Sequence, residues 1–318
     1  MTAILDNPAE RKPDIARNLT AAEQFADSLL PNRYFWPQDG SLLQLIPAGE
    51  FIMGSTLPQI ELARSMDRNG SLFALGCEVP QFRAAVPDFY LGVYAVTNAQ
   101  FAQFLAAANP TPKQLDRYFA TLDHLLPPLH EDEAWRVDPG YETHPIAHIS
   151  WYGADAYCRW AGLRLPTEIE WEKGARGADG RIFPWGDTWD ETRLRWHGGS
   201  RGESETTAPV DAYPEGSSPY GLRQMAGNVE EWCADPYRPK IYGRYASGDL
   251  RIPASGYGRV VRGGTCLRPN KLEFRCAMRR GNPAAYVNIL YTGLRCALDA
   301  TELMRRTTHK SEPSSQAH

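Results

Sequence analysis

Thiols are the most reactive side chains in this sequence, and their spacing limits their chemistry. No two of the six cysteines have the C-x₂-C spacing of a zinc knuckle, and six in 318 residues are too few for a disulfide scaffold. We expect thiols in a reducing environment. Cys266, which follows directly on Arg262-Gly-Gly-Thr265, is either a structural residue or a metal-binding or nucleophilic thiolate. The six are Cys77, Cys158, Cys233, Cys266, Cys276 and Cys296.

Two histidines have a spacing that occurs in metal sites, but the local sequence argues against one. His144 and His148 are four residues apart, and Pro145 between them favours a strand over a helix. In a strand this even separation only places both side chains on one face. We expect both histidines to have structural roles.

Basic residues gather in the last part of the chain, with few acids near them in the sequence. Alternation along strands would place some of them on one face, as a surface for anions or carboxylates. The alternative is a set of solvated strand edges kept apart by charge. These residues are Arg262, Arg268, Lys271, Arg275, Arg279, Arg280 and Arg295.

Short strands are expected to position these residues. Apolar runs on either side of Pro47-Ala48-Gly49 predict two strands with a tight connection, and a third strand is predicted over residues 88–96. The same criteria predict strands at 145–151, 259–264, 273–278 and 291–298.

Helices and loops complete the expected framework. Capping boxes predict helices beginning after Thr97 and after Thr167, and apolar spacing predicts another that ends at Gly162. A further capping box predicts a short helix over residues 20–30. Residues 177–264 lack a long periodic segment, so we expect them to form loops that carry the functional surface.

Composition bounds the class of protein. The hydrophobic content of 42% and the charged content of 23% exclude disorder as the main state. The net charge of −4 without a Lys/Arg run argues against a nucleic-acid or anionic-membrane surface, and no apolar run is long enough to span a bilayer. The polar N-terminus predicts a cytoplasmic protein. We expect an extension over 1–41, one loop-rich α+β domain over 42–300 and a mobile tail over 301–318.

Seven stretches of sequence carry a family pattern when they are taken together and in order. They are IPAGEFIMG (46–54), YAVTNAQFAQF (94–104), AYCRWAGLRLPTEIEW (156–171), FPWGD (183–187), GLRQMAGNVEEW (221–232), RGG (262–264) and GLRCA (293–297). In these stretches the chain resembles the formylglycine-generating enzyme family, also called the sulfatase-modifying-factor domain, over about residues 42–298. The resemblance implies an α+β, loop-rich variant of the C-type lectin fold.

The same resemblance implies a copper chemistry that this sequence only partly supports. Family enzymes oxidise a cysteine in a Cys-x-Pro-x-Arg peptide to formylglycine with oxygen, at copper(I) held by two thiolates. Cys266 takes the first thiolate position and Lys271 the second, and an ammonium group is no soft ligand. Thr265 replaces a family serine, and Glu230 replaces a family tryptophan of the pocket. Copper is therefore doubtful.

The resemblance also implies a calcium loop and a cysteine pair. The possible calcium ligands are the side chains of Gln224 and Glu231 and the carbonyls of Gly227 and Val229, with a metal-free turn as the alternative. Cys158 and Cys296 match a pair that is disulfide-bonded in secreted members, and we expect them to be close in space but reduced. The family partner of Cys276 falls at Ala175.

Two hypotheses for function follow. In the favoured one the copper site is lost and the domain binds an unidentified peptide, protein or small molecule, with Arg262, Lys271, Arg275, Arg279 and Glu230 as candidate ligand-binding residues. In the alternative a divergent oxidoreductase of the formylglycine-generating type acts on a cysteine or a small molecule through Cys266 and Thr265.

Overall fold

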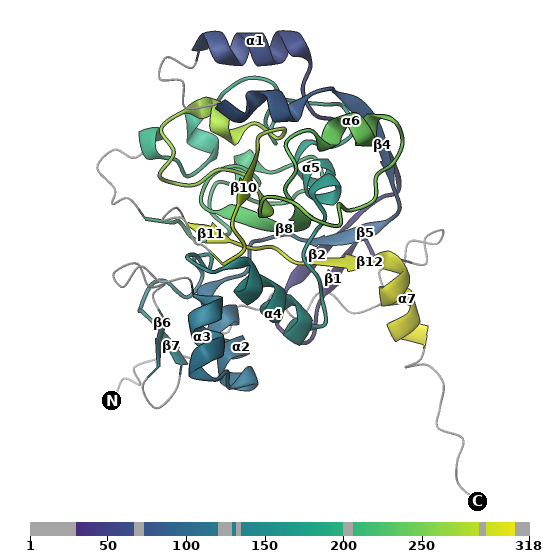
Figure 1. Cartoon of the computed structure of the whole chain (residues 1–318). Coiled ribbons are helices and arrows are strands. Elements are labelled where there is room, and N and C mark those ends of the chain that lie inside the picture. The colour runs from purple at the N-terminus through teal and green to yellow at the C-terminus, as the bar shows by residue number, and fades with distance from the viewer. Residues whose placement is uncertain are drawn as a thin grey trace, which may run out of the picture.

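The computed structural model describes residues 30–66, 73–119, 129–131, 135–199, 206–285 and 291–308. The helix predicted over residues 20–30 lies almost wholly outside the described residues. Within them the fold is built from two four-stranded sheets, two small strand pairs and helices that cover them (Figure 1).

The first sheet is antiparallel and holds the earliest and latest strands of the chain. Its order is β1-β2-β5-β12, and residue register pairs Leu45 with Tyr90 and Leu91 with Ala297. Apolar residues fill these strands, so the sheet buries Leu43, Tyr90 and Leu91 completely. The bounds are β1 (Arg33–Phe35), β2 (Leu42–Ile46), β5 (Phe89–Gly92) and β12 (Ala297–Asp299).

The second sheet carries several of the candidate site residues of the sequence in its strands and others in the loops next to them. Its order is β10-β9-β8-β11, with β11 parallel to β8 and the other pairs antiparallel. Arg262 lies opposite both Glu231 and Arg279 in the register. The bounds are β8 (Glu230–Pro236), β9 (Arg259–Arg262), β10 (Arg279–Asn282) and β11 (Thr292–Gly293).

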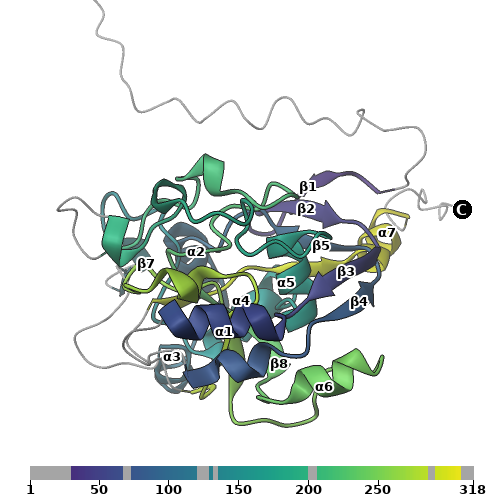
Figure 2. The same ribbon diagram turned by 90° about the horizontal axis from the view of Figure 1, so that it is seen from above.

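Two further strand pairs and a set of short helices surround these sheets (Figures 1 and 2). The strand pairs are β3 (Gly49–Met53) with β4 (Phe82–Val86), and β6 (Leu129–Glu131) with β7 (Trp135–Val137). The α-helices are α1 (Leu57–Met66), α2 (Asn98–Ala108), α3 (Pro112–Tyr118), α4 (Trp151–Ala161), α5 (Glu168–Arg176), α6 (Ile241–Ala246) and α7 (Ala300–Thr308). Single 3₁₀ turns are η3 (Phe73–Glu78), η4 (Glu191–Arg193), η5 (His197–Gly199), η6 (Pro214–Gly216) and η7 (Lys271–Phe274).

Helix α5 is the element on which both sheets pack. Its capping box is formed as the sequence predicts, because Thr167 accepts from the backbone of Glu170 and the Glu170 side chain accepts from the backbone of Thr167. Trp171 is fully buried in a cluster that contains Leu91 from the first sheet and Val260 from the second. The capping box at Thr97 and the Gly162 end of α4 are also confirmed.

The structure corrects two predicted strands. The strand predicted at 273–278 is instead η7 and a turn, and 145–151 contributes one isolated bridge between Pro145 and Thr97. The domain also extends beyond 42–300. β1 pairs with β2 on one side, and where a mobile tail was expected, the chain continues into α7. No helix among the described residues is long and apolar enough to cross a bilayer.

The burial of Leu303 gives a test of helix α7. Leu303 is 2% exposed and packs in the main apolar cluster, so Leu303→Ala should lower the free energy of unfolding by about 2–4 kcal/mol in urea denaturation. Thr301→Ala, at an exposed position two residues before Leu303, is the matched control and should change it by less than about 0.5 kcal/mol. Equal effects of the two substitutions would mean that α7 does not pack on the domain.

Candidate functional site

The loop that leaves β9 places Thr265 and Cys266 in the interior. Gly263 and Gly264 both have positive φ, and a Cβ on Gly264 would lie 2.9 Å from Cδ1 of Phe274 and 3.1 Å from the carbonyl oxygen of Glu273. The next two residues then turn inward. Thr265 is fully buried and Cys266 is 4% exposed, with the Cys266 backbone N–H donating to the Asn228 carbonyl at 2.9 Å.

This arrangement does not fit a copper(I) ion held by two thiolates. The second family position is Lys271, at the start of η7. Cys276 does not substitute for it. Its backbone N–H bonds to Ile182, and burial raises the pKa of its thiol to about 12. Cys77 lies against the carbonyl of Arg279 at 3.8 Å. The described residues contain no group of three His, Cys, Asp or Glu side chains able to hold a metal.

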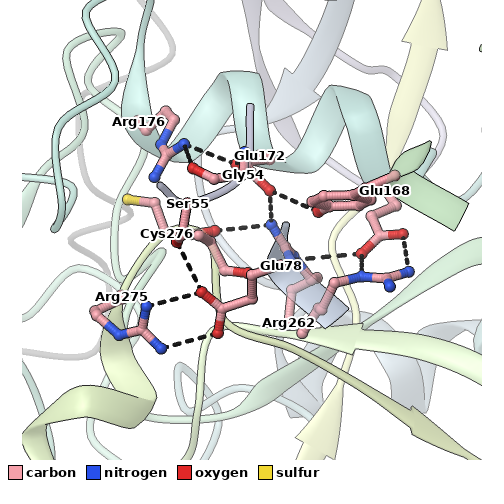
Figure 3. Close-up of polar contacts among 12 residues, drawn as sticks. Gly54, Ser55, Glu78, Glu168, Glu172, Arg176, Arg262, Arg275 and Cys276 are labelled. Atoms are coloured by element: carbon pink, nitrogen blue, oxygen red, sulfur yellow. Dashed lines mark hydrogen bonds and ion pairs between the residues drawn. The ribbon is translucent and has the colours of Figure 1, made fainter. Parts of the chain in front are cut away.

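Three candidate ligand-binding arginines are buried in ion pairs, so the exposed basic face expected from the sequence is wrong for Arg262, Arg275 and Arg279. Figure 3 shows Arg262 between Glu168 and Glu172 of α5, with N–O separations of 3.5 Å to Glu168 and a short contact to Glu172. Their partners come from α5 and η3, far away in the sequence, which is why local acid content gave no sign of them.

The geometry of these pairs is closed and bidentate. Arg279 donates to both oxygens of Glu168 at 2.6 and 2.7 Å, and Arg275 donates to both oxygens of Glu78 at 2.8 Å (Figure 3 labels the second pair). Burial alone would favour a neutral Glu172, but the charges of Arg262 and Arg176 hold the pKa of Glu172 below its ordinary value. These groups are therefore fixed charges that position the loop.

A second charged cluster lies nearer the surface and contains Glu230, the position at which the resemblance implies a pocket residue. We call it the quartet: Glu230, Glu273, Arg268 and Arg280. Arg280 contacts Glu230 at 3.0 Å and makes a short contact to Glu273, and Arg268 lies 3.5 and 3.1 Å from the same two carboxylates. The carboxylates are 4% exposed, whereas the guanidinium side chains are 24% (Arg268) and 20% (Arg280) exposed. The quartet carries no net charge.

An aromatic cluster that the sequence analysis did not single out adjoins the quartet. The Phe274 ring lies 5.9 Å from Trp189 and 6.2 Å from Trp196, and the two indoles meet edge to face at 5.0 Å. Phe274 follows Glu273, and the backbone N–H of His197 donates to the Arg268 carbonyl at 3.4 Å. Three tryptophans within residues 185–196 were the available sequence signal.

The possible calcium loop is held by protein contacts. Both oxygens of Glu231 accept from Arg295, at 2.7 and 2.8 Å, and one also accepts from the Trp171 indole at 2.7 Å. The amide oxygen of Gln224 accepts from Asn228 in a short hydrogen bond. A guanidinium already neutralises the one carboxylate of the set, so these residues do not fit a calcium ion.

The cysteine pair expected from the resemblance is close in space. The sulfurs of Cys158 and Cys296 are 3.6 Å apart, and both residues are buried as thiols. Cys276 packs in the same apolar cluster as Ala175, the position of its family partner. Both histidines for which structural roles were expected contact other side chains. Nδ1 of His144 lies 2.8 Å from Oγ1 of Thr207, and the His148 ring packs on the Tyr291 ring.

Comparison with known proteins agrees with the resemblance and the fold. The chain matches the family model of the sulfatase-modifying factor enzyme 1-like domain over residues 38–300. The formylglycine-generating enzyme of Streptomyces coelicolor is 33% identical over 294 residues, covering 80% of this chain and 88% of that enzyme. The structure of PvdO from Pseudomonas aeruginosa aligns with a TM-score of 0.62 at 21% identity, covering 86% of this chain and 99% of that one. The expected α+β, formylglycine-generating-type fold is confirmed.

A longer protein contains a similar segment. The chain is 37% identical to the serine/threonine-protein kinase Pkn1 of Chlamydia trachomatis over 227 residues, which cover 70% of this chain and 35% of that protein. The chain thus spans about a third of the length of this relative.

The crowding at Gly264 can be tested against a glycine with the same backbone strain. Gly264→Ala should lower the free energy of unfolding by about 2–4 kcal/mol, because the methyl group meets Phe274 in addition to the positive φ. Gly248 also has positive φ but nothing within 4 Å of the added Cβ, so Gly248→Ala should cost only about 1 kcal/mol. Equal losses in urea unfolding would show that the Gly264 turn is not packed against η7.

Asp235 in β8 gives a pH prediction. Burial, and then the charge of Glu168, raise the pKa of Asp235 to about 7, while its Oδ2 accepts the Glu168 backbone N–H at 2.8 Å. The folded state keeps this proton at pH values where the unfolded chain has already lost it. The contribution of Asp235 to the free energy of unfolding should therefore fall as the pH rises from 4 to 7. Asp235→Asn keeps the acceptor and removes the titration. Its stability relative to the parent should rise by a few kcal/mol across that window in denaturant titrations, and a constant difference would contradict the assignment.

Proposed function

The chain belongs to the family of sulfatase-modifying factor enzyme 1-like domains, and we propose that it is a binding module that has lost the family's copper oxidase site. The observation that carries the proposal is the donor set around Cys266. A lysine takes the place of the second thiolate, the Cys77 thiol lies against the Arg279 carbonyl, and burial keeps the Cys276 thiol protonated by raising its pKa to about 12. One thiolate leaves copper(I) without the soft ligand pair on which the chemistry depends.

The burial of the remaining thiol supports the same conclusion. Cys266 is 4% exposed and Thr265 is fully buried, so a peptide thiol has little access to either. A nucleophilic or redox cysteine ordinarily lies in an accessible, electropositive environment. Cys266 and Thr265 are therefore assigned to the packing of the loop rather than to catalysis.

The quartet provides recognition chemistry in place of redox chemistry. Its guanidinium groups donate in a planar fork that suits carboxylates, and its carboxylates accept from ammonium groups. Arg268 and Arg280 take over the role expected of Arg262, Arg275 and Arg279, because only the former two are partly open to solvent. Glu230 keeps its expected role, and Lys271 at the start of η7 adds a positive charge nearby.

The remaining expectations extend this proposal. We infer that the loop from Gln224 to Glu231 is held by Arg295 and Asn228 without calcium.

A cytoplasmic location is supported by six buried thiols, two of which lie 3.6 Å apart without a bond. The proposed partner is a small molecule or a peptide, rather than a nucleic acid or a membrane, because no Lys/Arg run is present.

The test measures copper and oxidation in one sample. Protein purified without oxygen is loaded with copper(I) in the presence of a competing chelator, and a Cys-x-Pro-x-Arg peptide is then added with oxygen. We expect no stoichiometric copper and no conversion of the peptide thiol to an aldehyde by mass spectrometry. Cys266→Ala should behave like the parent chain, because Cys266 does not hold the metal.

Stoichiometric copper that disappears in Cys266→Ala, together with oxidised peptide, would overturn the proposal in favour of a divergent oxidoreductase. Oxidised peptide without dependence on Cys266 would also overturn it. A formylglycine-generating enzyme, such as the Streptomyces coelicolor relative, serves as the positive control for the assay.

A further inference from the structure

The quartet differs from the ion pairs of Arg262 and Arg279 in being open to solvent. Arg262 and Arg279 are sealed with their carboxylates in the interior, whereas Arg268 and Arg280 keep 24% and 20% of their side chains exposed. Each guanidinium of the quartet contacts both carboxylates, but the Arg268 contacts are long, at 3.1 and 3.5 Å. A charged group of a ligand can therefore replace one of these ion-pair partners without the core being opened.

Two buried donors among the residues that the structure describes, one in the quartet and one in the aromatic cluster that adjoins it, have no hydrogen-bond partner. They are Nε of Arg268 and Nε1 of Trp196. Nε of Arg268 lies 3.1 Å from Glu273, but its N–H does not point at the carboxylate oxygen. The backbone bond between His197 and Arg268 holds the two segments together. Unsatisfied buried donors favour a ligand that brings acceptor oxygens.

Charge balance restricts the ligand. A simple anion that took Arg268 and Arg280 would leave Glu230 and Glu273 buried and uncompensated, and a simple cation would leave the two arginines without partners. A ligand with one positive and one negative group replaces each ion pair with another of the same kind. The quartet therefore selects zwitterions over singly charged molecules.

The neighbouring rings restrict it further. Trp189 and Trp196 are half-buried and form an apolar wall that packs on the buried Phe274 ring. Phe274 follows Glu273 of the quartet, and the backbone of His197, next to Trp196, bonds to Arg268. Aromatic side chains at such a wall add favourable contacts for another apolar or aromatic group.

We infer that the quartet is the binding site for a free amino acid with an apolar or aromatic side chain. The carboxylate pairs with Arg268 and Arg280, the ammonium group pairs with Glu230 and Glu273, and the side chain lies on the wall of Trp189 and Trp196. This inference rests on the proposed function and names its ligand class.

The experiment removes one ligand charge at a time. The full chain is titrated by calorimetry with L-phenylalanine, L-leucine and L-tryptophan, and then with N-acetyl-L-phenylalanine, which lacks the ammonium group, and phenylalaninamide, which lacks the carboxylate. At least one amino acid should bind with a dissociation constant of about 1 mM or tighter, and its two single-charge analogues should bind at least about tenfold more weakly. The affinity should fall as salt is raised.

Matched variants assign the binding to the quartet. Arg268→Gln should weaken amino-acid binding at least about tenfold while the circular dichroism spectrum stays unchanged, because the Arg268 contacts are long and partly exposed. Arg251→Gln is the control, since Arg251 is 85% exposed and pairs with Asp249 on another segment. This control should bind like the parent chain.

Three results would overturn the inference: no binding by any of the three amino acids, equal binding of the single-charge analogues, or unchanged binding in Arg268→Gln. The copper and peptide assay separates this failure from failure of the proposed function. A chain that neither oxidises the peptide nor binds amino acids would still be a binding module, but not one with this ligand.

Discussion

The contact of Arg262 and Arg279 with the carboxylates of α5 is the interaction on which the rest of the molecule depends. These charges are removed from water, so neither side is stable without the other, and the cost of breaking one pair is an uncompensated charge in the core. Because Arg262 ends β9 and Arg279 begins β10, the pairs fix the second sheet against the helix. Gly263 and Gly264 then leave β9 from a defined point, and this defines where Thr265, Cys266 and η7 lie.

The same two functional groups serve two purposes at different depths. Arg279 with Glu168 is sealed and acts as architecture, whereas Arg268 with Glu273 is partly wet and exchangeable. A sealed pair gives geometric precision, and a wet pair can trade partners at modest cost. The fold thus combines buried ion pairs that fix the backbone with partly exposed ion pairs that can change partners, and this combination suits the recognition of a polar ligand.

Much of this framework could be predicted from sequence because its signals are local. The capping boxes at Thr97 and Thr167 and the glycines after Arg262 act within a few residues, and the structure forms all of them. The charge partners could not be predicted. Glu78 and Arg275 are separated by 197 residues, and only tertiary packing brings them together. The arginine-rich segment therefore predicted an exposed basic face, although several of its arginines are buried in the core. Helix α7 was missed for a related reason, since only Ala300 and Leu303 anchor an otherwise mostly polar segment to the core.

The placement of β1 and α7 has a consequence for how the domain can be used. β1 is an edge strand of the first sheet, and α7 packs on β12 and β5 of that sheet. The quartet belongs instead to β8 and β10 of the second sheet, to η7 and to the loop before η7. A chain joined next to β1 or α7 would therefore attach at the first sheet and leave the quartet on the second sheet accessible. The domain is therefore suited to being carried as a module, presenting the same surface in whatever larger protein it is joined to.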